Sequence, residues 1–180
     1  KIAERPYGYS SFCGDASDAV RFGAENQLEV HVDNPAFSSR WYPGAGIYRE
    51  VRMLLLEAEH FLYSGIRIRT EDIDPDKRTA ILRVETEASV DDAEIRLETK
   101  VGGKSYSVSG VSPLCLAVAG FGLWSADTPE LYPVTVTLLK NGEVKDVQTV
   151  NCGFRKVEFD ARRGLSVNGR PERLKGVCLH

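Results

Sequence analysis

Short segments in which apolar and polar residues alternate recur along this chain and constrain its fold more than any other feature. In residues 27–33, for example, Leu28, Val30 and Val32 fall on one face and polar residues fall on the other. A period of two is that of a β-strand with one buried face. The same alternation recurs in residues 80–86 and 93–101. Helix signals are scarce, so the sequence predicts an all-β protein.

Two Asn-Gly dipeptides mark hairpin turns between such segments. Asn141-Gly142 lies between two strand-like segments, and Asn168-Gly169 lies near the end of the sequence. Both central residues of a type I′ turn need a positive φ, which Asn and Gly adopt most readily. Several short strands joined by such turns predict an antiparallel β-sandwich of the immunoglobulin-like type.

The chain divides into three parts. Residues 1–56 end in a strand expected from Ile47, residues 57–155 hold enough strands for one sandwich, and residues 156–180 contain the second hairpin signal. The last part has too few apolar residues for a core of its own, so we expect it to pack against something else. Cys152 is expected to follow the last sandwich strand, so the domain lacks the immunoglobulin Cys-Trp-Cys signature.

Charge and hydropathy exclude several classes of partner. The formal net charge is −3, with 23 Lys and Arg against 26 Asp and Glu, so the chain offers no basic surface to a phosphate backbone. No apolar run approaches the length of a bilayer span, and the first residues lack the apolar stretch of a signal peptide. We therefore expect neither a nucleic-acid partner nor a membrane span.

The four cysteines show no metal-binding pattern. Cys13, Cys115, Cys152 and Cys178 are widely separated, with no Cys-x-x-Cys pair and no histidine at metal-ligand spacing. We expect no metal site, no cofactor, and four free thiols rather than disulfides. Cys115 lies within the apolar run of residues 114–118, which predicts that it is a small buried residue of the sandwich core.

Several aspartates raise the question of catalytic carboxylates. They cluster in two polar segments, at Asp72, Asp74 and Asp76 and at Asp91 and Asp92. Both segments carry turn signals, the first of them a proline between two aspartates. Solvated turn residues are therefore the favoured interpretation.

The densest cluster of aromatic, basic and turn-forming residues is the run SRWYPGAGIYREV at residues 39–51. Its proline and two glycines predict a tightly shaped loop. Arg40, Trp41 and Tyr42 have two open interpretations. They stack on and hydrogen-bond a sugar, or they fix the loop by cation–π and packing contacts.

Several segments, taken in order, carry a resemblance to a known family. They are ENQLEVHVDN at 25–34, the run at 39–51, LWSADTPELY at 123–132, GFRKVEF at 153–159, LSVNGRP at 165–171 and LKGVCLH at 174–180. Together they resemble glycoside hydrolase family 2, and its β-galactosidase branch in particular. The resemblance implies an interior piece of a larger enzyme. Residues 1–56 would end a jelly-roll sugar-binding domain, 57–155 would form an immunoglobulin-like domain, and 156–180 would be a connecting hairpin and the first strand of a (β/α)8 catalytic barrel.

The resemblance also implies a retaining exo-glycosidase whose two catalytic glutamates lie on the barrel, beyond His180. The chain itself is then non-catalytic. His180 matches the histidine that follows the first barrel strand and contacts the sugar, and Arg40 and Trp41 lie on a loop near the barrel mouth. These three are the expected substrate-binding residues. Cys178 stands where many β-galactosidases have Asn, so family membership is implied more strongly than a galactoside substrate.

The implied partners are a carbohydrate substrate and the remaining jelly-roll and barrel domains of the same chain. A homo-oligomer, and either the bacterial cytoplasm or the periplasm, are compatible with the resemblance. The alternative is a stand-alone carbohydrate-binding or adhesion sandwich. The ending GVCLH at residues 176–180 argues against it, because a self-contained module has no reason to end in a strand that reads as buried.

Overall fold

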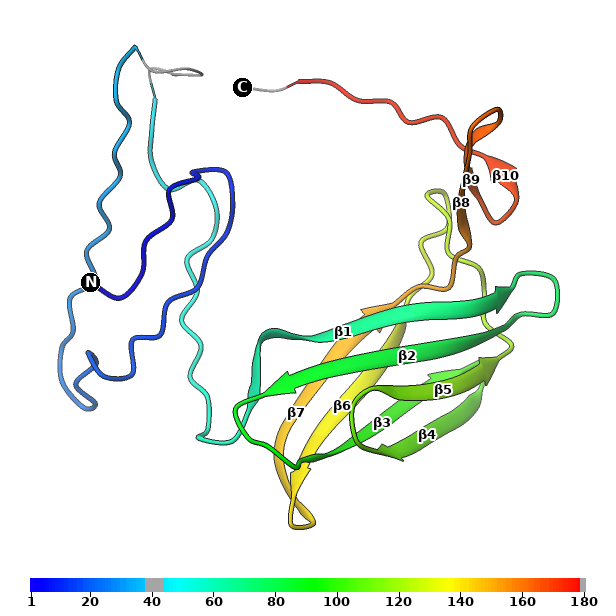
Figure 1. Ribbon diagram of the computed structural model, residues 1–180, viewed down its shortest axis with the longest axis horizontal. Helices are drawn as coiled ribbons and strands as arrows, with labels where there is room; N and C mark the ends of the chain where they lie inside the picture. The colour runs from blue at the N-terminus through cyan, green and yellow to red at the C-terminus, as the bar shows by residue number, and fades with distance from the viewer. Residues whose placement is uncertain (38–43, 179–180) are drawn as a thin grey trace. The chain divides into compact units, whose positions relative to one another are not determined.

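The computed structural model describes residues 1–37 and 44–178, which belong to two compact units, Lys1–Leu55 and Leu56–His180. In these ranges the chain forms strands and turns and no helix, and the sheets are antiparallel throughout (Figure 1). The all-β prediction is therefore confirmed. No helix of the described residues is long and apolar enough to cross a membrane.

The second unit contains two sheets that face each other across one core. The first sheet has the order β1-β2-β5 and the second the order β4-β3-β6-β7. The strands are β1 (Phe61–Asp74), β2 (Thr79–Ala88), β3 (Glu94–Val101), β4 (Lys104–Gly110), β5 (Leu114–Ala119), β6 (Tyr132–Lys140) and β7 (Glu143–Cys152). Three and four antiparallel strands packed in two layers make the β-sandwich that the alternating segments predict.

Alternate residues of the central strands supply the core. Leu82 and Val84 of β2 and Leu97 of β3 are at most 1% exposed, and Val136 of β6 is fully buried between them and its neighbours. The face predicted from residues 80–86 and from 93–101 is the face that the structure buries. Burial of these side chains supplies the main driving force for the layered fold, at roughly 25 cal/mol for each Å² of apolar surface removed from water.

Both predicted hairpin turns are present. Asn141 and Gly142 join β6 to β7 with φ of 54° and 79°, and Asn168 and Gly169 have φ of 52° and 76°. Two successive positive φ values are the mark of a type I′ turn, whose twist matches that of the flanking strands.

A third, small sheet follows the sandwich. It has the order β10-β9-β8, with β8 at Val157–Asp160, β9 at Gly164–Val167 and β10 at Arg170–Pro171. Its apolar side chains are poorly covered, since Phe159 is 80% exposed. After β10 the described chain continues without regular structure to Cys178.

The strands expected in the first unit are not observed. Residues 27–33 and the segment from Ile47 carry no strand, and Leu28, Val30 and Val32 are about half exposed or more. A strand needs a partner to satisfy its backbone groups, and the described residues of this unit form no such pairing. A short turn lies near Asp15, since the backbone N–H groups of residues 19 and 20 donate to the carbonyl of Ala16.

The predictions for Cys115, expected to be buried, and for Cys152, expected to follow the last sandwich strand, are both wrong. Cys115 is exposed, and Cys152 is the buried last residue of β7 rather than a residue beyond the sandwich. The run at 114–118 belongs to a strand with one buried face, so Leu114, Leu116 and Val118 point inward and Cys115 points outward. Its partner across the ladder is Arg83. All four cysteines are free thiols.

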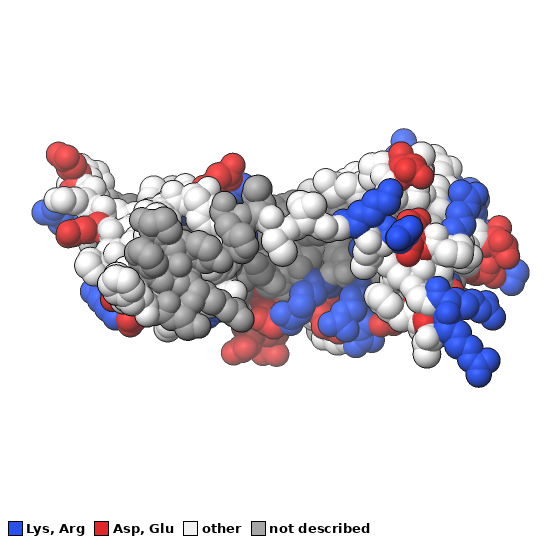
Figure 2. Space-filling model, turned by 90° about the horizontal axis from the view of Figure 1, so that it is seen from above, with Lys and Arg blue, Asp and Glu red and all other residues white. Residues whose placement is uncertain are grey.

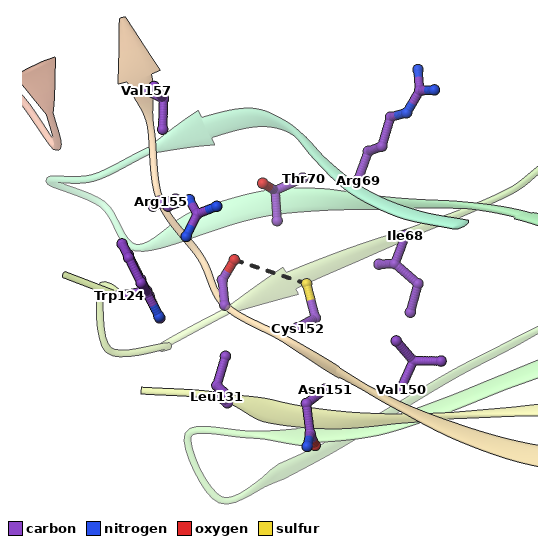
Figure 3. Close-up of a pocket in the computed structure, with 11 residues that line it drawn as sticks. Ile68, Arg69, Thr70, Trp124, Leu131, Val150, Asn151, Cys152, Arg155 and Val157 are labelled. Carbon is purple, nitrogen blue, oxygen red and sulfur yellow. Dashed lines mark hydrogen bonds between the residues drawn. The ribbon is translucent and has the colours of Figure 1, made fainter. Parts of the chain in front are cut away.

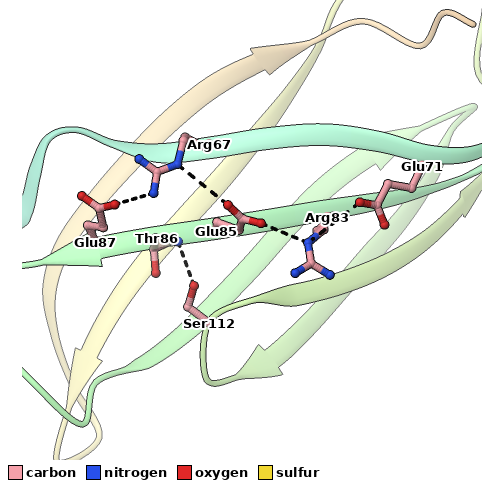
Figure 4. A network of polar contacts seen from close by, with 7 residues as sticks. All are labelled: Arg67, Glu71, Arg83, Glu85, Thr86, Glu87 and Ser112. Carbon is pink, nitrogen blue, oxygen red and sulfur yellow. Dashed lines mark hydrogen bonds and ion pairs between the residues drawn. The ribbon is translucent and has the colours of Figure 1, made fainter.

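The outer face of the β1-β2 pair carries a ladder of ion pairs (Figure 4). Arg67 pairs with Glu87 and lies 3.9 Å from Glu85, and Arg83 lies 3.1 Å from Glu85 and 3.9 Å from Glu71. Glu85 therefore lies between two guanidinium groups, and its hydrogen bond with Arg83 lowers its pKa. On the face seen in Figure 2, basic and acidic side chains occur next to one another.

Strand β1 lies at an edge of its sheet and is interrupted twice. Its register with β2 shifts between Phe61 and Ile66 and again between Glu71 and Asp74. Each interruption contains a residue with a left-handed backbone, Ser64 with φ of 58° and Asp72 with φ of 47°. These are β-bulges, which bend the strand and increase its twist.

Candidate functional site

The residues expected to bind substrate are not placed by the structure. Arg40, Trp41 and His180 lie outside the described residues, as does Tyr42. The described part of the same run, residues 44–51, has no regular structure, and Ile47 and Tyr48 are exposed.

An open groove of ≈ 590 Å³ lies in the second unit where the edge strands β1 and β7 approach each other (Figure 3). Its lining comes from β1 (Ile68, Arg69, Thr70), from β7 and the chain after it (Val150, Asn151, Cys152, Gly153, Arg155, Val157), and from Trp124 and Leu131. None of these described lining residues is an aspartate or a glutamate. The groove therefore lacks the pair of carboxylates that glycoside hydrolysis requires.

Trp124 and Arg155 form the end of this groove. The guanidinium carbon of Arg155 lies 4.2 Å from the centre of the Trp124 ring, within the range of a cation–π contact. Gly153 allows the indole to approach the backbone, because a Cβ placed there would lie 2.9 Å from Cδ1 of Trp124. The backbone N–H of Trp124 donates to the carbonyl of Phe154 at 2.8 Å, which fixes the loop of residues 123–132 against the chain that leaves β7.

We call the contact between the loop of residues 123–132 and the chain that leaves β7 the junction. A cluster of aromatic rings packs beside it. Phe121 and Phe154 stack with their centroids 4.1 Å apart, and the ring of Tyr132 meets Phe154 edge-on at 5.4 Å. The Tyr132 hydroxyl accepts a hydrogen bond from the backbone N–H of Gly122 at 2.7 Å and donates to Glu130. Burial raises the pKa of Tyr132, and the neighbouring carboxylate acts in the same direction. The hydroxyl therefore stays protonated and acts as a structural donor.

Asn168 joins the small sheet to this junction. Its side-chain Nδ2 donates to the carbonyl of Trp124 at 2.9 Å, and its Oδ1 accepts from the backbone N–H of Lys156, also at 2.9 Å. Its own N–H donates to the carbonyl of Lys156 at 2.8 Å. One residue thus connects the β9-β10 turn, the start of β8 and the loop of Trp124. This contact is polar, since apolar side chains of the same final part, such as Phe159 and Leu174, are exposed.

The candidate carboxylate Asp74 occupies a structural position in a turn. Asp74 accepts backbone hydrogen bonds from Asp76 and Lys77, both at 3.0 Å, and pairs with the Lys77 ammonium at 3.1 Å. The bond from Lys77 lowers the pKa of Asp74. Residues 75–78 form the turn between β1 and β2, as the aspartates and proline predict. Among the described residues no group of three or more His, Cys, Asp or Glu could hold a metal ion.

Comparison with known proteins identifies the family. The model of glycosyl hydrolases family 2 matches residues 64–155, which is the greater part of the sandwich. The chain belongs to glycosyl hydrolase family 2. This family 2 chain is 34% identical to the β-galactosidase BoGH2A of Bacteroides ovatus over 197 aligned residues, covering 99% of the chain and 23% of that protein. It is 32% identical to a putative β-glucuronidase of Formosa agariphila, covering the whole chain and 18% of that protein.

Solved structures of glycosidases have a fold similar to that of this chain. A family 2 member from Bacteroides cellulosilyticus has a TM-score of 0.75 at 25% identity, covering 99% of this chain and 25% of that one. A β-glycosidase from Bacteroides vulgatus has a TM-score of 0.63 at 28% identity over 81% of this chain. This family 2 chain spans less than a third of the curated relatives that it matches almost throughout, 23% and 18% of the two named above and 29% of a β-glucuronidase of Bacteroides fragilis.

The sequence does not predict the contacts that Asn168 and Arg155 make with Trp124. It predicts Asn168 only as a turn former, and it gives no signal for Arg155. The available signal for Asn168 was the residue type itself, since the Asn side chain can satisfy backbone groups beside a turn in a way that Gly cannot.

Proposed function

We propose that this chain is a non-catalytic segment of a retaining family 2 exo-glycosidase that hydrolyses terminal β-glycosides. In the intact enzyme it would hold the sugar-binding domain against the catalytic barrel. Family membership and the short share of each relative's length support the larger enzyme. The non-catalytic role rests on the resemblance to the family, which implies that both catalytic glutamates lie on the barrel, beyond His180.

The single observation that carries the linking role is the junction at Asn168. Its hydrogen bonds to Trp124 and Lys156 attach the small sheet to the end of the sandwich. A segment whose own apolar residues are exposed is thereby oriented by directional polar contacts. Such an attachment is suited to presenting the chain that follows β10 in one direction.

The substrate-binding residues remain part of this proposal. We place Arg40 and Trp41 at the mouth of the barrel and His180 at the end of its first strand, where active sites of that fold lie. The sugar and the other domains of the same protein are then the partners. The hydrolytic mechanism would belong to two glutamates on the barrel, with a covalent glycosyl-enzyme intermediate.

We propose a β-galactoside as the preferred substrate class. The relative named β-galactosidase is 34% identical, and the putative β-glucuronidase is 32% identical. Two percentage points are a narrow margin, so the substrate panel must include both sugars. A β-glucuronide has a carboxylate that a β-galactoside lacks, and binding it requires an additional cationic group.

The test is to extend the open reading frame past His180 and to assay the full-length protein. Nitrophenyl β-galactoside, β-glucuronide and β-glucoside form the panel. Hydrolysis with retention of configuration, fastest for the galactoside, is the expected result. A stop codon directly after His180, or binding of sugars without hydrolysis by the full-length protein, would instead establish the stand-alone binding module.

A further inference from the structure

A four-residue strip where the chain enters the sandwich, Ala58 to Phe61, is held by side chains from the β2-β3 connection and from β7. The strip begins close to the boundary between the two compact units, which falls between Leu55 and Leu56. Its last residue, Phe61, is the first of β1 and is 1% exposed. The contacts on the strip come from the β2-β3 connection on one side and from β7 on the other.

Ser89 makes three hydrogen bonds to the strip. Its Oγ donates to the carbonyl of Ala58 at 2.9 Å and accepts from the backbone N–H of His60 at 2.9 Å. Its own N–H donates to the carbonyl of His60, again at 2.9 Å. Ser89 therefore satisfies three backbone groups of a segment that belongs to no sheet at that point. Its hydroxyl is used as both donor and acceptor.

Asp146 and Lys145 hold the strip from the other sheet. The Asp146 Oδ2 accepts from the backbone N–H of Phe61 at 2.9 Å and from the Gln148 amide at 3.1 Å. The Lys145 ammonium lies 2.9 Å from the Glu59 carboxylate, with both side chains about two-thirds or more covered, at 26% and 33% exposure. The hydrogen bond with Glu59 raises the pKa of Lys145, so its ammonium stays charged at neutral pH.

A bulge in β7 explains how two consecutive residues can serve one segment. Leu138 of β6 pairs with Asp146, whereas Leu139 pairs with Val144, so Lys145 is the additional residue. In a regular strand neighbouring side chains point to opposite faces. An additional residue breaks that alternation and redirects a side chain. The bulge thus lets Lys145 and Asp146 both reach the same strip.

We propose that Ser89, Lys145 and Asp146 are positioning residues that anchor residues 58–61 of the second unit and fix the direction of the chain where it enters the sandwich. The contacts are directional, come from the β2-β3 connection and from β7, and act on four consecutive residues. None of the three side chains is needed for the apolar core. The functional part of this inference rests on the proposed glycosidase activity, in which the first unit contributes to the substrate pocket.

Hydrogen exchange on the 180-residue chain tests the anchor directly. The Ser89→Ala change should speed exchange of the His60 amide at least about tenfold, and Asp146→Ala should do the same for the Phe61 amide. The core amide of Leu97 should be unaffected. Ser89→Thr keeps the hydroxyl and should restore protection. Unchanged exchange at His60 and Phe61 in the two alanine variants overturns the anchor.

The full-length enzyme tests the positioning role. Ser89→Ala and Asp146→Ala should raise KM by about threefold or more while kcat changes less than about twofold, because binding geometry rather than chemistry is disturbed. Ser107→Ala and Asp127→Ala, at exposed positions away from the strip, are the matched controls. Faster exchange with unchanged KM overturns the positioning role. A wild-type enzyme without glycosidase activity refutes the proposed function, whereas the exchange result still decides the anchor.

Discussion

The guanidinium of Arg155 lies over the indole of Trp124, with 4.2 Å between the guanidinium carbon and the ring centre. This contact joins the loop of residues 123–132 to the chain that leaves the last sandwich strand. It also closes one end of the groove between β1 and β7.

Removing the cation should weaken the junction modestly. Arg155→Ala should lower the free energy of unfolding by about 0.5–1 kcal/mol, the usual size of a cation–π contact at an exposed site. Arg155→Lys should lose less. Equilibrium urea unfolding followed by Trp fluorescence measures both. Arg162→Ala, at an exposed turn position, is the control for loss of one arginine, and an equal effect there would rule out a specific Arg155 contact.

Two substitutions separate the turn function of Asn168 from its bridging function. Asn168→Gly keeps the positive φ but loses the side-chain bonds to Trp124 and Lys156, whereas Asn168→Ala loses both features. We expect the glycine variant to lose about 1–2 kcal/mol and the alanine variant to lose more. Exchange of the β8 and β9 amides should quicken in both. Wild-type protection in the glycine variant would show that the bridge has no structural effect.

The cysteines should react in the order opposite to the one that their sequence context predicts. Cys115 is exposed on the outer face of β5, so a thiol reagent should label it rapidly in the folded protein. Cys152 is 9% exposed and burial raises its pKa, so it should react slowly until the sandwich unfolds. Peptide mass spectrometry after timed labelling measures both. Faster labelling of Cys152 than of Cys115 would contradict the observed facing of β5 and β7.

The reason for that error is physical. A run of five apolar residues predicts a buried strand, but periodicity within the run cannot tell which residues face the core. The two hairpins and the core faces of 80–86 and 93–101 were predictable because φ requirements and alternation are local properties. The contact of Asn168 with Trp124 was not, since it depends on where distant strands end. The strands expected at 27–33 need a pairing partner that the described residues do not supply.

Acid should destabilise the sandwich partly through the β1-β2 turn. The folded-state pKa of Asp74 is lowered by its hydrogen bonds and its ion pair with Lys77, so the unfolded chain binds a proton more readily. The ionised Asp74 carboxylate contributes to the free energy of unfolding above its unfolded-state pKa of about 4. That contribution is lost as the pH falls through the lower folded-state pKa. Asp74→Asn should therefore make stability fall less steeply below about pH 4. Urea midpoints at several pH values measure the slope, and Asp127→Asn is the control.

The isolated 180-residue chain should not hydrolyse any nitrophenyl glycoside, because the proposed mechanism assigns both catalytic carboxylates to the barrel, beyond His180. In the full-length enzyme, His180→Ala should lower kcat/KM at least about tenfold, or about 1.4 kcal/mol of transition-state binding. Thermal stability should change little. If the isolated chain hydrolyses a glycoside and substitution of one of its carboxylates abolishes that activity, the assignment is refuted. If the His180→Ala enzyme has unchanged kinetics, His180 is not a site residue.

The two bulges of β1 have a consequence for how this sandwich behaves at high concentration. An edge strand exposes unpaired N–H and C=O groups that can recruit the edge of another molecule. Between the shifts that contain Ser64 and Asp72, only a short stretch of β1 keeps a regular ladder. Arg67 and Arg69 in that stretch add charge that a second strand would have to desolvate. The same irregularities that bend β1 therefore disfavour edge-to-edge pairing of two molecules through this strand.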